Sequence, residues 1–455
     1  MFVFLFTYIF SFIASLIKIL KGRVDAILFF FIFGLPVYVT ANSLCLMYGF
    51  GSFIPVLQSF KELIVIITLA LLIFRYNYTI NLNLLDKLVI LYFVIVFIYA
   101  MIPLGPLGFL QRLIALKSIA FFPFVYFIGR HMPVSTVSLN KYFHFFALLA
   151  IAAAVVVLFE VITNQHLQTH TGYANFNYKI YKQEPSGHYG LSWTFETENG
   201  LKRFASFFSM PLEHAAATVI SVAVILATIT LQKHNIRTNR YFFFAIIATC
   251  ISIIFALSRA AFASYLLLFY VYALITNKKK LLFYFHTGMI IIVLIIAFFI
   301  IRGDLYDFII STIDFSNSSS QSHILDWLLS VNTLINHPFG VGLGTAGNVA
   351  STLADSIGGE NELLIIGVQA GFIPLLLYAF IYGYVLYSAY KFFKNYSGTT
   401  KTLALMVLLL KIGLILATLT SEIESYIYVS YVTWFFTGFM FNVKDNEYGL
   451  KPALT

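Results

Sequence analysis

Three arginines lie where apolar segments begin or end, and their side chains could bind an anion. Arg203 precedes a proline that opens one apolar run, Arg259 stands alone in a short hairpin between two others, and Arg302 directly follows a fourth. A planar guanidinium suits two-point binding of a phosphate group better than an ammonium does. The alternatives are contact with lipid head groups for Arg203, an ion pair with a loop carboxylate for Arg259, and a helix-end anchor for Arg302.

A second group of polar candidates lies in residues 302–361, which contain acids and histidines but no Lys or Arg after Arg302. Glu360 stands at the start of a long apolar segment, and His323 and His337 lie earlier in the same stretch. A carboxylate here could perform acid and base chemistry beside a bound phosphate, and the histidines titrate near neutral pH. The simpler explanations are a match between Glu360 and the positive end of a helix dipole, and helix-end roles for both histidines.

Glu213 and His214 fall inside an apolar run. Ionisable groups within a membrane are costly, so both side chains should face the protein interior or a hydrated cavity. They either contact substrate or form a mutual pair that holds two helices together. No spacing of carboxylates or histidines matches a defined metal site, so we expect neither a metal nor a cofactor.

Membrane helices must position these residues, because 60% of the residues are hydrophobic and only 10% are charged. The mean hydropathy of +0.89 exceeds that of a typical water-soluble protein. Apolar runs of roughly 17 to 25 residues recur between short polar breaks. The sequence therefore predicts an all-α polytopic integral membrane protein with about twelve or thirteen transmembrane helices, in a single transmembrane domain over residues 1–455.

Most of the basic residues, which give a formal net charge of +9, fall on one side if the spans alternate. The positive-inside rule makes that side cytoplasmic, so the charge reports orientation and we expect no nucleic-acid partner. Two long loops, residues 164–205 and 302–361, then face outward. Apolar residues at helical spacing predict an amphipathic helix at 321–336 that lies flat on the outer surface. Residues 362–389 are predicted to form one continuous span.

The order of these features resembles that of the bacterial O-antigen polymerase and O-antigen ligase superfamily, over roughly residues 140–440. The matching motifs are, in order, Arg203-x-x-Ser206 to Pro211, Ser258-Arg259-Ala260, His337-Pro338-Phe339-Gly340-Val341-Gly342-Leu343-Gly344, Glu360-Asn361 and Gly371-Phe372. Ligases of this superfamily carry a histidine immediately before the asparagine, where this chain has Glu360. That departure favours a polymerase over a ligase.

The resemblance implies a GT-C-like glycosyltransferase in the bacterial cytoplasmic (inner) membrane, with its active site on the outer, periplasmic face. The implied reaction is a metal-independent transfer of a glycan from undecaprenyl diphosphate to a lipid-linked repeat unit. Glu360 would be the catalytic base, and the arginines Arg203, Arg259 and Arg302 would bind the diphosphate. The implied partners are membrane lipid and a chain-length-regulating co-polymerase. The candidate substrate ligands are Glu213, His214, His323, His337 and Asn361.

Two other functions remain open. A ligase would transfer the glycan to lipid A core or to another acceptor. A transporter for the polysaccharide or its lipid carrier would show similar halves with helices broken near mid-membrane. The sequence shows no such duplication.

Overall fold

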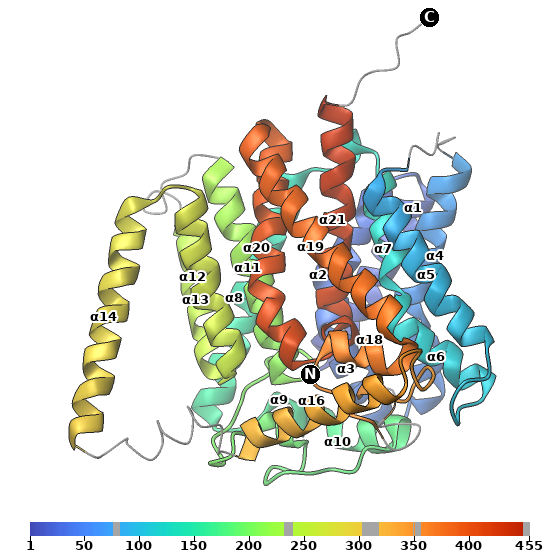
Figure 1. Ribbon diagram of the computed structural model, residues 1–455, viewed down its shortest axis with the longest axis horizontal. Helices are drawn as coiled ribbons and strands as arrows, with labels where there is room; N and C mark the ends of the chain where they lie inside the picture. Colours follow the sequence, from blue (N-terminus) through green and yellow to red (C-terminus); the bar gives the residue numbers. More distant parts are fainter. Residues whose placement is uncertain (76–81, 232–239, 303–317, 349, 351–355, 449–455) are drawn as a thin grey trace, which may run out of the picture.

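Apolar helices run side by side through most of the protein (Figure 1). The computed structural model describes residues 1–75, 82–231, 240–302, 318–348, 350 and 356–448. Within these residues the only strand-like pairing is an isolated antiparallel bridge between Glu196 and Lys202. The protein is thus an all-α polytopic membrane protein, as its hydropathy predicts.

The helices follow one another with short connections. The helices that make up the bundle are α1 (Phe2–Leu20), α2 (Ile27–Phe33), α3 (Tyr38–Met47), α4 (Ile54–Arg75), α5 (Leu84–Met101), α6 (Phe109–Ala120), α7 (Phe122–His131), α8 (Leu139–Thr163), α11 (Pro211–Leu231), α12 (Arg240–Phe255), α13 (Arg259–Ile275), α14 (Lys279–Arg302), α19 (Phe372–Asn395), α20 (Gly398–Thr420) and α21 (Ile427–Tyr448). The helices of the two long loops are α9 (Leu167–Thr171), α10 (Tyr173–Phe176), α16 (Ser318–Asn336) and α18 (Glu362–Ala370).

Among the described residues, eight helical segments are long and apolar enough to cross a membrane, and the bent pair α6 and α7 raises the number to nine. The segment α11 is the most buried of these, whereas α1, α4, α5 and α19 each leave much of their surface exposed. The helices α12 and α13 are apolar but shorter, and α14 and α21 cover the remaining predicted segments. That these four helices also cross the membrane stays a prediction, and so does the expected total of about twelve or thirteen spans.

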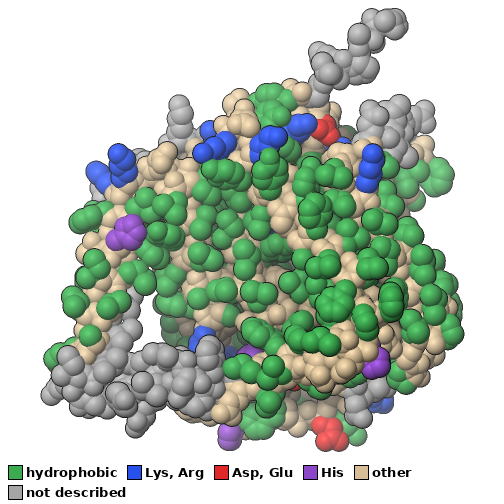
Figure 2. All heavy atoms as spheres, viewed as in Figure 1, with side chains coloured by type: hydrophobic (Ala, Val, Ile, Leu, Met, Phe, Trp, Pro, Cys, Tyr) green, Lys and Arg blue, Asp and Glu red, His purple; other side chains and the backbone are tan. Residues whose placement is uncertain are grey.

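The two ends of the bundle differ in character. Figure 1 places the C-terminal end of α21 and the connection between α13 and α14 at one end, and α9, α10 and α16 at the other. Lys and Arg side chains gather along the first end, and the middle of the same face is largely apolar (Figure 2). The polar loops that carry the candidate residues therefore lie at the end opposite the basic rim.

The predicted continuous span at 362–389 is wrong, because the helix breaks at Gly371 between α18 and α19. Gly371 has φ +86°, and a Cβ there would lie 2.5 Å from the Pro338 carbonyl oxygen. The Phe372 N–H donates to that same carbonyl at 3.0 Å. The break exists because the glycine-rich block at 337–344 packs against the helix end and supplies hydrogen bonds that a continuous helix would supply internally.

The same block is also bonded to the last turn of α18. The Val341 N–H donates to the Val368 carbonyl at 2.8 Å, and the Gly342 N–H donates to the Gln369 carbonyl at 3.1 Å. The Gln369 side chain completes the contact by accepting from the Gly344 N–H at 2.7 Å. The glycine-rich motif therefore has a structural role, which is to dock the second loop onto the helix bundle.

The helix α16 contains the predicted amphipathic helix at 321–336 and crosses the end of the bundle (Figure 1). Its buried side chain Leu334 packs near Gly367 of α18. Its opposite face exposes Leu325, Leu328 and Ile335. An apolar face left open at the end of a membrane bundle is typical of a helix that lies in the membrane interface.

Substituting Gly371→Ala should destabilise the protein, because alanine is strained at this φ and its Cβ meets backbone atoms. We expect the free energy of unfolding to fall by about 1 to 3 kcal/mol, measured as a lower apparent Tm of the detergent-purified protein. The control is Gly383→Ala in α19, where a Cβ meets nothing within 4 Å. Equal apparent Tm values for the two variants would contradict the docking role of Gly371.

Candidate active site

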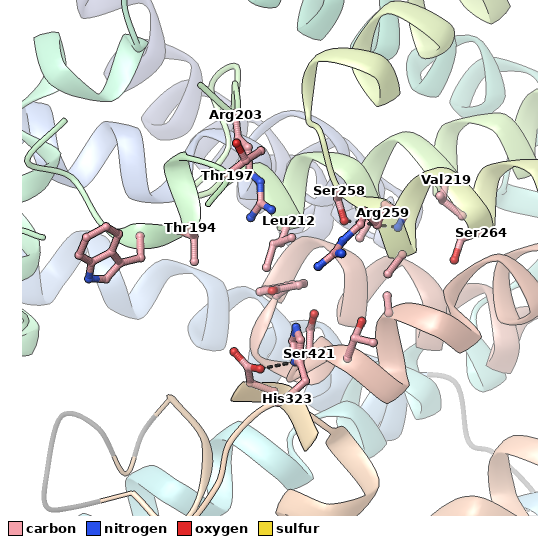
Figure 3. Close-up of a pocket in the computed structure, with 18 of the residues that line it drawn as sticks. Thr194, Thr197, Arg203, Leu212, Val219, Ser258, Arg259, Ser264, His323 and Ser421 are labelled. Carbon is pink, nitrogen blue, oxygen red and sulfur yellow. Dashed lines mark hydrogen bonds and ion pairs between the residues drawn. The ribbon is translucent and has the colours of Figure 1, made fainter. Parts of the chain in front are cut away.

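A cavity of about 620 Å³ lies where the first loop meets α11, α13, α16 and the turn that follows α20 (Figure 3). Arg203, Arg259, His323 and Glu360 all line it. The structure thus brings together residues from four separate parts of the chain that the sequence marked independently.

Arg203 reaches the cavity at the end of a short hairpin in the first loop. The bridge between Glu196 and Lys202 pairs the two arms of this hairpin. The Arg203 N–H donates to the Phe195 carbonyl at 2.8 Å, which extends the pairing by one residue. The arginine backbone is therefore held before any ligand binds.

The environment of Arg203 is unfavourable for a lone cation. Its Nε is buried and has no hydrogen-bond partner among the described residues. Burial lowers the pKa of the Arg203 guanidinium and the charge of Arg259 lowers it further, whereas Glu198 acts in the opposite direction. A bound anion would supply the missing acceptor and offset the repulsion between the two cations.

Arg259 is the first residue of α13. Leu257 adopts φ +45° and turns the chain, and the Ser258 Oγ then caps the helix by accepting the Ala261 N–H at 3.3 Å. A cation at this position faces the positive end of the helix dipole, which favours anions. Figure 3 shows that the Arg203 and Arg259 side chains point into the same space.

His323 and Glu360 approach this space from the opposite side. The His323 Nδ1 contacts the Glu360 carboxylate, as the dashed line in Figure 3 marks. The Glu360 side chain remains 42% exposed, so a substrate hydroxyl could reach it. Burial raises the pKa of nearby Asp326, the Glu360 charge adds to the rise, and His323 opposes it. A carboxylate held by an imidazole can accept a proton from a bound alcohol.

Asn361 does not line the cavity. Its Oδ1 caps α18 by accepting the N–H groups of Leu363 at 3.0 Å and Leu364 at 3.2 Å. The asparagine of the Glu360-Asn361 motif thus starts the helix and fixes where Glu360 stands.

Glu213 and His214 are also absent from the cavity lining, and the structure does not pair them with each other. Glu213 accepts from the N–H of Ser209 at 3.2 Å and from its hydroxyl. The His214 Nδ1 lies 3.1 Å from the Phe204 carbonyl oxygen, and its ring stacks on Phe208. Both side chains are buried and tie the first loop to α11. Nothing in this placement supports the expected contact with substrate.

His337 and Arg302 fall outside the site for different reasons. His337 is exposed just beyond the C-terminal end of α16 and does not line the cavity. Arg302 ends α14, and its side chain lies outside the described residues.

Reasoning from the sequence missed an acidic cluster behind the second loop, made of Glu362, Glu422 and Glu424. The Glu424 N–H donates to Glu362 at 3.1 Å, and the Glu424 carboxylate accepts from the Tyr378 hydroxyl at 2.5 Å and from the Trp434 indole at 2.7 Å. Burial and the charges of the other two glutamates raise the pKa of Glu362. Two acids in a hairpin between apolar runs could have been noticed by the same argument as Arg259.

Glu422 of this cluster anchors the residues that follow the glycine-rich block. Its carboxylate accepts the Asn348 N–H at 2.5 Å. Burial raises the pKa of Glu422 to about 7, although the Asn348 N–H favours the charged form. Glu422 therefore connects the second loop to the turn after α20.

Reasoning from the sequence also missed His188 and Glu196, which line the cavity from the first loop. No spacing distinguishes them in the sequence. Across the described parts of the chain, no group of three or more His, Cys, Asp or Glu side chains is arranged to hold a metal ion.

No protein-family model matches the sequence, and no curated protein is significantly similar to it. Two guanidinium groups on one wall and a carboxylate with an imidazole on the other could bind an anionic leaving group and deprotonate an attacking hydroxyl.

Substituting Arg203→Ala should weaken the binding of inorganic pyrophosphate by at least about tenfold, because the cavity loses one of its two guanidinium groups. Calorimetric titration of the purified protein measures the effect. The matched control is Lys202→Ala, since Lys202 is adjacent, donates to the Asn164 carbonyl and does not line the cavity. Equal weakening in both variants would show that only the net charge of the loop matters.

The contribution of Glu422 to stability should fall as the pH rises from about 4 to about 7. A buried carboxyl whose folded-state pKa is raised stabilises the fold below its unfolded pKa of about 4.3, and this contribution is lost as the pH rises through about 7. Glu422→Gln should remove at most about 3 kcal/mol of this dependence, read as a flatter plot of apparent Tm against pH. Exposed Glu184→Gln is the control. An unchanged slope in Glu422→Gln would contradict the assignment.

Proposed function

We propose that this protein is a polysaccharide polymerase that transfers a growing glycan from undecaprenyl diphosphate to the non-reducing end of a lipid-linked repeat unit. The observation that carries the proposal is the placement of Arg203 and Arg259 in one cavity, opposite Glu360 and His323. The resemblance to the O-antigen polymerase and ligase superfamily supplies the substrate class.

The arginines would act on the leaving group. When the anomeric carbon of the donor sugar separates from the phosphate oxygen, negative charge develops on the diphosphate. Arg203, Arg259 and the N-terminal end of α13 would stabilise that charge. Glu198 partly offsets the repulsion between the two cations, and the negative charge that develops on the diphosphate would offset it further in the transition state.

The proton of the attacking hydroxyl would go to Glu360. The acceptor oxygen forms the new bond to the anomeric carbon, the bond from that carbon to the phosphate oxygen breaks, and the diphosphate leaves with the electron pair. His323 would hold the Glu360 carboxylate in position through its Nδ1 contact. The transfer needs no oxidant and no co-reactant.

The deeper part of the cavity suits the lipid carrier. Small and apolar residues of three membrane helices line it, among them Ala216 of α11, Ala261 of α13 and Ala417 of α20. A polyprenyl chain could lie along such a wall while its diphosphate stays at the arginines. We place this end of a GT-C-like bundle on the periplasmic face of the inner membrane, because the basic residues gather at the opposite end.

Purified protein incubated with one lipid-linked repeat unit should produce a ladder of products on a gel. Glu360→Gln should abolish the ladder, with a rate loss of about 100-fold or more, because a general base typically contributes that much. The control is Glu184→Gln, an exposed substitution in the first loop that does not line the cavity.

Three other results would contradict either the polymerase activity or the role of Glu360. Transfer only after a core lipid is added would indicate a ligase that uses Glu360 in place of histidine. Movement of the lipid across vesicles without any new glycosidic bond would indicate a transporter. Full ladder formation by Glu360→Gln would remove the base role.

A further inference from the structure

Trp193 is an exposed aromatic residue of the first loop that lines the cavity. Its side chain is 65% exposed, whereas Tyr173, Phe176 and Phe195 are buried and pack the loop onto the bundle. Trp193 lines the cavity rather than completing this packing. The His188 ring makes an edge contact with the Trp193 ring, with the ring centroids 5.9 Å apart, and the exposed remainder of the indole offers a flat apolar surface.

Polar residues follow Trp193 in the chain and line the same cavity, so Trp193 is not only in contact with apolar or lipid groups. Thr194, Thr197 and Glu198 line the same cavity, which therefore contains hydroxyl and carboxylate groups as well as the indole. In Figure 3 the labelled side chains of Thr194 and Thr197 lie on the Arg203 side of the cavity. A cavity with an aromatic surface and hydrogen-bonding groups suits a ligand that has both a C–H face and hydroxyl groups.

His188 adds an oriented hydrogen-bonding group to this wall. The buried carboxylate of Glu196 lies 3.0 Å from the His188 Nδ1 and accepts the His188 backbone N–H at 2.9 Å. When Nδ1–H donates to the carboxylate, the Nε2 of the neutral ring is an acceptor. The His188 side chain is 70% exposed, so Nε2 is accessible to a hydroxyl donor.

The wall is held in place by the loop itself. The Tyr189 hydroxyl donates to the Gly200 carbonyl at 2.6 Å, and the hydroxyls of Ser192 and Thr194 lie 2.6 Å apart. Gly187 permits the close approach of Glu196, because a Cβ on it would lie 2.5 Å from Oε1. A surface fixed in this way loses little conformational entropy when a ligand binds.

We propose that Trp193, His188 and the Thr194 to Glu198 segment form a saccharide subsite beside the arginines. One sugar ring of the lipid-linked substrate stacks on the Trp193 indole, and a sugar hydroxyl donates to the His188 Nε2. The subsite rests on the proposed function, since it defines which wall of that cavity binds the glycan while Arg203 and Arg259 bind the diphosphate.

The two halves of the substrate can be tested separately with the full-length protein in detergent. The first probe is the phosphate-free oligosaccharide cut from the lipid-linked repeat unit, and the second is inorganic pyrophosphate. Titration calorimetry should show that Trp193→Ala raises the Kd for the oligosaccharide on the order of tenfold. His188→Ala should raise it on the order of fivefold. The Kd for pyrophosphate should stay within about twofold in both variants.

Two further variants distinguish the loss of the stacking contact from a general loss of loop structure. Trp193→Phe keeps an aromatic face and should restore most of the affinity for the oligosaccharide. Tyr178→Ala removes an exposed aromatic residue of the same loop that does not line the cavity, and it should have no effect.

Three results would overturn the subsite. An unchanged oligosaccharide Kd in Trp193→Ala would identify Trp193 as an interfacial anchor only. Equal loss of both probes would indicate a disturbed loop. No oligosaccharide binding by the wild type at millimolar concentration would exclude a sugar-binding wall. The proposed function fails on a different result, since it requires a polymer ladder from the wild-type protein whatever these titrations give.

Discussion

The architecture of the site depends on the hydrogen bonds between the glycine-rich block and the broken helix at Gly371. Backbone groups near a membrane must be satisfied, and here the carbonyls at the end of α18 accept from the block while Pro338 accepts from the start of α19. This contact fixes the second loop, and with it α16 and the residues before α18. His323 and Glu360 therefore line the cavity from the two segments that this contact joins, α16 and the residues before α18.

The charged side chains that line the cavity determine which chemistry it can support. Arg203 and Arg259 lie near each other at the N-terminal end of α13, where burial and the Arg259 charge disfavour the charged form of Arg203 and Glu198 favours it. Glu196 and Glu198 line the cavity from the first loop, Glu360 lines it in contact with His323, and Glu362 is buried. The cavity thus contains both guanidinium and carboxylate groups, the two kinds of group that the proposed transfer uses.

Hydropathy predicted the helical membrane fold and the amphipathic α16, because both depend on periodic patterns along the chain. The cost of isolated charges near a membrane marked Arg203 and Arg259, and both line one cavity, whereas their binding of a diphosphate stays a prediction. The same argument marked Glu213 and His214, yet these are bonded locally to the first loop, a distinction that depends on packing between distant segments. The break at Gly371 was missed for the same reason, since its cause lies in a block about thirty residues earlier in the chain.

The most direct test of the central claim is a cryo-electron microscopy map of the protein with undecaprenyl diphosphate bound. The account predicts diphosphate density between the Arg203 and Arg259 guanidinium groups, with the polyprenyl chain running along the wall formed by α11, α13 and α20. Diphosphate density elsewhere on the protein, with the arginines engaged only by protein carboxylates, would contradict it.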